Sequence, residues 1–290
     1  MEQPWDKVIL PRRRLLDIPW RELWRYRDLI WLMAARNLTV QYKQTVLGAG
    51  WFVVQPLLTT LVFSFLFGRV AKLGTEGIPH FLFYMSGIVV FSYLSDCVNK
   101  TAVTFTKNAN LFGKVYFPRL AVPISQGISS LAAFGMQFGM FLAGLLFYLA
   151  KAKWFPDPNH PIHVDPNWRM VLFPVFLLQT AMLGIGMGLI IASLTARYRD
   201  MLLAVGFCVQ LWMYASSVVF PLSRVKDSEH LALLKLNPMV PIIEGFRFAF
   251  LGEGMVTRQD LLVSFATCLA VFVVGLVMFC RAERTVMDTV

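Results

Sequence analysis

The chain has 290 residues, of which 57% are hydrophobic, 14% are aromatic and only 15% are charged, and its formal net charge is +10. Soluble domains usually carry about 25% charged residues, so this composition argues against a water-soluble protein and favours one that faces lipid. The positive charge alone would suit nucleic acid, but the basic residues do not belong to a polar, foldable domain, so we expect no nucleic-acid partner.

The first predicted element is a basic helix over residues 20–43, within a segment 1–46 that we expect to be cytoplasmic. Its apolar residues recur along one helical stripe, which comprises Trp20, Leu23, Trp24, Trp31, Ala34 and Leu38. A basic helix with a tryptophan-rich face is typical of an amphipathic helix in the membrane interface. Its ordinary role is topological anchoring, and the alternative is that its cations attract an anionic lipid head group such as a diphosphate.

Six later windows contain no Asp, Glu, Lys or Arg. They are 44–68, 77–95, 120–150, 170–196, 201–223 and 261–280. A helix needs about 20 apolar residues to cross the hydrocarbon core, and each window is about long enough. We therefore predict an all-α integral membrane protein with six transmembrane helices over 47–281, followed by a cytoplasmic tail, 282–290. The glycines at 184, 186 and 188 indicate close helix packing within the fourth window.

The distribution of Lys and Arg predicts the orientation of the chain. With the N-terminus inside, the cytoplasmic segments carry a net charge of +8 and the outer segments a net charge of +2. This bias places both termini in the cytoplasm.

Two charged residues, Asp96 and Lys100, continue the second window at i, i+4 spacing, so they would share one helical face. A charged residue inside a membrane helix suggests function by default, but a structural pair that neutralises itself is an equally good interpretation.

The segment that follows, 107–119, is a compact basic loop on the predicted inner side and has the size of a docking element for a cytoplasmic partner. An ordinary connecting loop is the plainer interpretation.

A short segment on the outer side, "LNPMVPIIEGFR" over 236–247, is apolar but interrupted by Pro238 and Pro241. It is too short to cross the membrane. Its apolar positions recur at helical spacing while Glu244 and Arg247 share another face, so we predict short amphipathic or re-entrant helices at about 229–254 that form an outer gate. The alternative is an ordinary surface helix between spans.

Catalytic and metal-binding motifs are not found in the sequence. Gly113-Lys114 is followed by valine rather than a hydroxyl residue, so the chain lacks the phosphate-binding loop of an ATPase. The four cysteines are isolated, and His160 and His163 lie in a proline-rich loop typical of a solvated turn. We expect a protein that is not an enzyme and has neither a metal site nor a cofactor of its own.

Four stretches in register resemble the membrane subunits of ABC-2 type exporters, in particular the O-antigen, teichoic-acid and capsule polysaccharide permeases. They are "RNLTVQYKQTVLGAGWFVVQP" (36–56), "NANLFGKVYFPRL" (108–120), "GIGMGLIIASLTARYRDM" (184–201) and "LNPMVPIIEGFR" (236–247). The likeness covers roughly residues 25–280, and the pairing of "YKQTVLGAGW" with "KVYFPR" is most similar to the O-antigen branch.

The resemblance implies a half-transporter in the bacterial inner membrane. A homodimer would form the channel, two copies of a cytoplasmic subunit would bind and hydrolyse ATP with magnesium, and the cargo would be a polyisoprenyl-diphosphate-linked glycan moved from the cytoplasm to the periplasm. The family's cytoplasmic contact maps onto 20–43 and 107–119. The docking candidates there are Arg36, Lys43, Lys107, Lys114 and Arg119.

Aromatic side chains suit a glycan path, because flat rings bind sugar faces weakly and repeatedly. The candidates are Trp51, Phe91, Tyr93, Trp212 and Tyr214. For any one of them, an aromatic belt or helix packing is the plainer interpretation.

Three other functions remain open at this point. The first is an ABC-2 exporter of another cargo, such as capsule polysaccharide, a drug or a lipid. The second is an ion-coupled secondary transporter that uses Asp96 and Lys100, although no inverted repeat is visible. The third is a membrane-bound transferase, which the missing acid and base residues disfavour.

Overall fold

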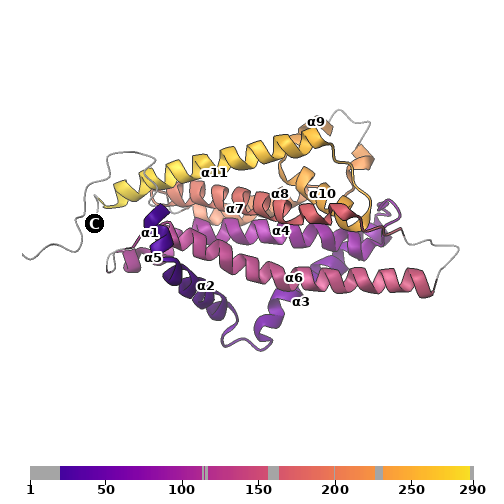
Figure 1. The fold of residues 1–290 in the computed structure, drawn as a ribbon, viewed down its shortest axis with the longest axis horizontal. Helices are drawn as coiled ribbons and strands as arrows, with labels where there is room; N and C mark the ends of the chain where they lie inside the picture. The colour runs from indigo at the N-terminus through magenta and orange to yellow at the C-terminus, as the bar shows by residue number, and fades with distance from the viewer. Residues whose placement is uncertain are drawn as a thin grey trace, which may run out of the picture.

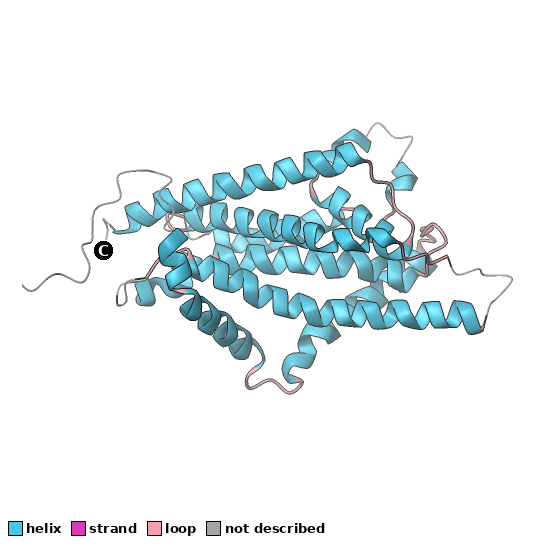
Figure 2. Ribbon diagram, viewed as in Figure 1, coloured by secondary structure: helices cyan, strands magenta, loops and turns pink. Residues whose placement is uncertain are grey.

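The structure is a computed structural model that describes residues 20–112, 114, 117–155, 163–198, 200–225 and 231–287. All regular elements in this part of the chain are helical (Figure 2). The helices are α1 (Trp20–Arg25), α2 (Arg27–Tyr42), α3 (Trp51–Phe63), α4 (His80–Ala102), α5 (Thr104–Phe112), α6 (Ala121–Trp154), α7 (Phe173–Thr195), α8 (Met201–Tyr214), α9 (Leu231–Leu236), α10 (Met239–Leu251) and α11 (Arg258–Met287).

Five helical segments among the described residues are long and apolar enough to cross a membrane. They are Gly48–Val70, His80–Ala102, Ala121–Trp154, Trp168–Thr195 and Arg258–Glu283. Each overlaps one of the predicted windows. The first contains α3 with a 3-10 turn before it and a π-helical continuation after it, and the fourth begins with the 3-10 turn that leads into α7. The chain is therefore a multi-span helical membrane protein.

The fifth window, 201–223, differs from the prediction of a full-length span. Only its first part forms a helix, α8, which has 14 residues and a length of about 21 Å at 1.5 Å per residue, less than the roughly 30 Å of a hydrocarbon core. The rest of the window consists of turns, bends and the start of a short 3-10 helix, Leu222–Val225. Freedom from charge predicted a continuous helix there, but side chains from a later segment bind the backbone at the end of α8.

The central helix of the bundle is α7, which lies between α4 and α11 (Figure 1). Gly186 explains how closely α7 and α11 approach, since a Cβ atom there would lie 2.7 Å from the Cα of Phe272. Gly275 on α11 meets the backbone of Gly186 in return. The close packing expected at Gly186 is confirmed.

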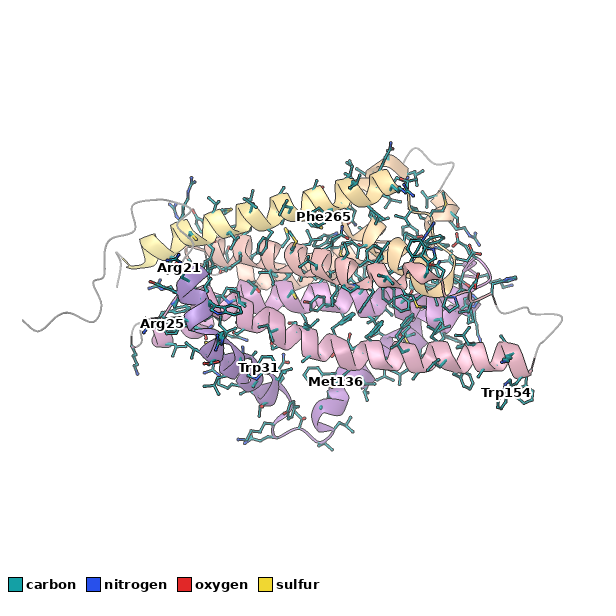
Figure 3. All side chains as sticks on the ribbon, in the orientation of Figure 1. Arg21, Arg25, Trp31, Met136, Trp154 and Phe265 are labelled. Carbon is teal, nitrogen blue, oxygen red and sulfur yellow. The ribbon has the colours of Figure 1, made fainter. Side chains whose placement is uncertain are left out.

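The two ends of the bundle are formed by different elements. At one end lie α1, α5 and the C-terminal end of α11, and α9 and α10 lie toward the other (Figure 1). Arg21 and Arg25 mark the first end in Figure 3, and Trp154 on α6 marks the opposite one. Elements that the sequence assigned to the cytoplasm thus share one end of the molecule.

The predicted interface helix over 20–43 is two helices, because the chain turns at Tyr26 between α1 and α2. Only some of its apolar residues face the bundle, and the others face outward. Leu23 and Ala34 are buried against the bundle, whereas Trp24 and Trp31 are 71% and 69% exposed. The helix pair therefore packs on the bundle through small and aliphatic residues and leaves tryptophans outside, as Figure 3 shows for Trp31.

Candidate functional site

The segment "LNPMVPIIEGFR" runs from the last residue of α9 into α10, and Glu244 and Arg247, predicted to share the polar face of an amphipathic or re-entrant helix, are buried instead. Glu244 and Arg247 are each only 1% exposed, and the same holds for most of the helix. Their side chains form an ion pair with a 3.1 Å contact between Arg247 Nη1 and Glu244 Oε1. The remaining oxygen, Glu244 Oε2, accepts a hydrogen bond from the Met255 backbone N–H at 3.1 Å. The helix belongs to the core of the bundle.

Burial controls the titration of this pair. Removal from water raises the pKa of the Glu244 carboxyl and lowers the pKa of the Arg247 guanidinium, and the charge of each partner opposes the shift of the other.

Arg247 joins α10 to α4 and to the end of α8. The guanidinium donates to Ser217 O at 2.6 Å, Val218 O at 3.2 Å, Phe83 O at 3.3 Å and Ser86 Oγ at 3.2 Å. It also lies 3.7 Å from the centroid of the Phe83 ring, in the geometry of a cation–π contact. Gly87 makes room for it, because a Cβ there would lie 3.0 Å from Arg247 Nη2. The arginine therefore satisfies buried backbone carbonyls of the turn that follows α8, which have no place in a helix.

Asn237, which lies two residues before α10, performs a similar role although its place in the sequence did not single it out. Its Oδ1 accepts from Trp212 Nε1 at 3.0 Å and from the Met239 backbone N–H at 3.1 Å. Its Nδ2 donates to Ala215 O at 3.1 Å. The sequence feature that could have identified Asn237 is the preference of asparagine for positions just before a helix.

The two prolines fit the first turn of α10. Pro238 immediately precedes the helix and Pro241 is its third residue, where a missing backbone N–H costs no helical hydrogen bond. The Pro238 carbonyl accepts a hydrogen bond from Ser264 Oγ of α11 at 2.8 Å. The prolines thus start α10 without weakening it.

The five aromatic candidates fall into two groups. Phe91 and Tyr93 on α4 are 3% and 4% exposed, so the chain itself encloses them. Trp51 and Tyr214 are 47% and 44% exposed. Trp212 is partly buried, lies edge-on to Phe91 at 6.4 Å and is held by Asn237. The structure does not gather the five on one surface.

Asp96 and Lys100 form an ion pair on α4, with 2.9 Å between Lys100 Nζ and Asp96 Oδ2. The side chains remain 40% and 18% exposed, respectively, so the bundle does not enclose the pair. The pair lies on the same helix as Phe91 and Tyr93, but it is partly exposed whereas those two aromatic residues are buried.

Four of the five predicted docking residues are exposed: Arg36, Lys43, Lys107 and Lys114. The fifth, Arg119, has a structural role, because its Nη1 donates to Glu283 O at 3.3 Å and its guanidinium lies 5.2 Å from the Phe112 ring centroid.

A second apolar core holds this end of the molecule together. Its members come from α1, α2, α5, the turn before α6, and α6, α7 and α11: Leu23, Ile30, Met33, Phe105, Phe117, Leu120, Ala121, Val122, Leu189, Ala192 and Phe279. Within it, Phe105 stacks on Phe279 with ring centroids 4.7 Å apart. The segment 107–119, predicted as a loop, is thus partly helical: Lys107 lies on α5, whose Phe105 packs in this core, and Lys114 follows that helix.

Comparison with known proteins finds a matching family and several similar export proteins. The sequence model of the family described as "ABC-2 type transporter" matches residues 28–251. The O-antigen export system permease protein RfbA of Myxococcus xanthus is 29% identical over 244 residues, which cover 83% of this chain and 87% of that protein. The protein of the same name from Klebsiella pneumoniae is 21% identical, with 87% and 91% covered. The capsule polysaccharide export inner-membrane protein CtrC of Neisseria meningitidis is 20% identical, with 90% and 93% covered.

Proposed function

Because the chain belongs to the ABC-2 type transporter family and is homologous to O-antigen export permeases, we propose that it carries a lipid-linked, O-antigen-like polysaccharide from the cytoplasm to the periplasm. Two copies form the channel, and a separate cytoplasmic subunit hydrolyses the ATP. The observation that carries this proposal is the likeness to an O-antigen permease over more than four fifths of both chains.

In this proposal the end of the bundle with α1, α5 and the C-terminal end of α11 faces the cytoplasm. Its exposed cations, Arg36, Lys43, Lys107 and Lys114, then meet the ATPase, and both termini lie on this side. The chain crosses the bacterial inner membrane six times, with α8 and the turns after it as a sixth, partly non-helical crossing. Irregular backbone is tolerated at that depth because protein side chains bind it.

The opposite end, with α9 and α10, closes the outer mouth. The contacts of Arg247 support this role, since they tie α10 to both α4 and the end of α8. The charge-assisted hydrogen bonds oppose movement of α10, so in this proposal they keep the outer mouth closed until they are exchanged for other partners.

Deletion of the gene in its own bacterium tests the proposal. We expect surface polysaccharide to disappear and lipid-linked polymer to accumulate inside the cell, with both effects reversed by a plasmid copy. Deletion of the cognate ATPase should give the same result. Normal surface polysaccharide after deletion would contradict the proposal, and accumulation of capsule polymer instead would reassign the cargo.

A further inference from the structure

One face of α4 differs from the surface of the other membrane helices. In the part of the helix from Phe91 to Ala102, every residue that is not buried is polar, and each is partly exposed: Ser92, Ser95, Asp96, Asn99 and Lys100. These positions recur at i, i+3, i+4, i+7 and i+8, so they form a single stripe along the helix. We call this set the α4 polar stripe.

The other spans expose large apolar side chains. On α3 these include Leu58, Leu61 and Val62, and on α11 they include Leu269, Val273 and Val274, with exposed fractions of 43% to 54%. Such surfaces suit lipid. A charged residue that faces the centre of a bilayer costs at least about 2.5 kcal/mol, so the α4 polar stripe is not built to face lipid.

The stripe extends well into the membrane and does not sit only at its edge. Ser92 precedes Ala102, the last residue of α4, by ten positions, which corresponds to about 15 Å along the helix axis. This is about half the thickness of a hydrocarbon core. The two helices α3 and α8 also contact α4, and each has an exposed amide, Gln55 and Gln210, respectively.

The chemistry of the stripe suits an uncharged, hydroxyl-rich ligand. Lys100 and Asp96 neutralise each other through their 2.9 Å contact, so the stripe has no net charge. Asn99 Nδ2 donates to Ser95 O at 2.9 Å and to Ser95 Oγ at 3.1 Å, which orders the amide and hydroxyl groups. A diphosphate would require an unpaired cation, whereas sugar hydroxyls both donate and accept hydrogen bonds.

We propose that the α4 polar stripe forms one wall of the water-filled inner half of the transport path and contacts the sugar units of the passing glycan. The partly exposed polar side chains bind hydroxyl groups in turn, and none of them holds the glycan tightly because no net charge is available. This inference rests on the proposed function for the identity of the ligand.

Accessibility of introduced cysteines tests whether the stripe faces water. Ser92→Cys and Ser95→Cys each exchange one oxygen for sulfur, in a background with Cys208→Ala and Cys280→Ala, since the other two cysteines, Cys97 and Cys268, are buried. We expect both to react with a charged, membrane-impermeant methanethiosulfonate in inside-out vesicles. The matched control is Val274→Cys, which lies nine residues before the end of the α11 span, and we expect it to react at least ten-fold more slowly.

The same variants test contact with the glycan. In vesicles from cells that make the polymer, we expect labelling at Ser92→Cys to be several-fold slower than in vesicles from cells blocked in its synthesis. Equal rates, or labelling no faster than at Val274→Cys, would overturn the proposal. Restoration of surface polysaccharide by the unaltered chain in a deletion strain reports on the proposed function separately, so the two failures are distinguishable.

Discussion

Arg247 is buried and therefore requires hydrogen-bond acceptors from the protein, because its guanidinium N–H groups have lost their contact with water. Four oxygen acceptors besides Glu244 and one aromatic ring meet that need. They come from α4 and from the end of α8, two elements distant from it in sequence. One residue thus fixes the position of α10 against two others.

Replacement of Arg247 by methionine should destabilise the protein strongly, since it leaves Glu244 buried and unpaired. Loss of one partner of a buried pair typically costs about 3–5 kcal/mol. The measurement is thermal unfolding of the detergent-purified protein, with membrane abundance as a second readout. The control is Arg169→Met, because Arg169 also lies over a phenylalanine, at 4.5 Å, but is exposed. An equal loss of stability in both variants would mean that the buried contacts of Arg247 contribute no more to stability than those of the exposed Arg169.

Trp51 and Tyr93 should behave differently although both are aromatic path candidates. Trp51→Ala is expected to slow polysaccharide export several-fold at normal membrane abundance, because the exposed ring is free to meet cargo. Tyr93→Ala should lower abundance, since removal of a buried aromatic side chain typically costs about 3–5 kcal/mol. Quantitative immunoblots and surface polysaccharide assays give the two readouts. If Tyr93→Ala is abundant and Trp51→Ala exports normally, the assignment by exposure is wrong.

At the scale of elements, the spans could be predicted because solvation by lipid is a local property of each window. Freedom from charge over about 20 residues located five of them. The surroundings of α10 could not be predicted in this way. Glu244 and Arg247 have the same i, i+3 spacing on a surface helix as on a buried one, and only the packing of α4 and the end of α8 decides between them. Likewise, nothing within 201–223 indicates that Asn237 and Arg247 bind its backbone.

The contact of α7 with α11 should not tolerate a side chain at Gly186. Gly186→Leu would place carbon atoms on the backbone of Phe272, so we expect severe loss of folded protein. Gly135→Leu on α6 is the matched control, because a Cβ there meets nothing within 4 Å. Size-exclusion profiles of fluorescently tagged variants measure the difference. Similar profiles for both would show that α7 and α11 separate more easily than their packing indicates.

At the scale of the whole molecule, the chain is asymmetric from one end to the other. A packed aliphatic and aromatic base carries exposed cations at the end with α1 and α5, whereas the end with α10 is built around a buried charged pair and a cluster of phenylalanines. The composition of the loops supports the proposal of which end faces the cytoplasm, but it could not predict that Arg119 has structural contacts while Lys107 and Lys114 are exposed.

Charge reversal tests the docking role of the first end. The double variant Lys107→Glu with Lys114→Glu should reduce co-purification of the cognate ATPase several-fold, because two attractive cations become repulsive to the same partner surface. Lys151→Glu with Lys153→Glu makes the same change at the far end of α6, where we expect no effect. Full ATPase binding by the first variant would remove the 107–119 loop from the interface.

The dependence of α8 on Asn237 and Arg247 also has a consequence for biogenesis. The ribosome completes α8 more than twenty residues before it reaches Asn237, so the carbonyls of Ala215, Ser217 and Val218 wait for donors encoded later. Hydrocarbon offers no substitute for those donors. In the proposed topology, where the turn after α8 lies at membrane depth, we therefore expect α8 and α10 to enter the bilayer as one unit.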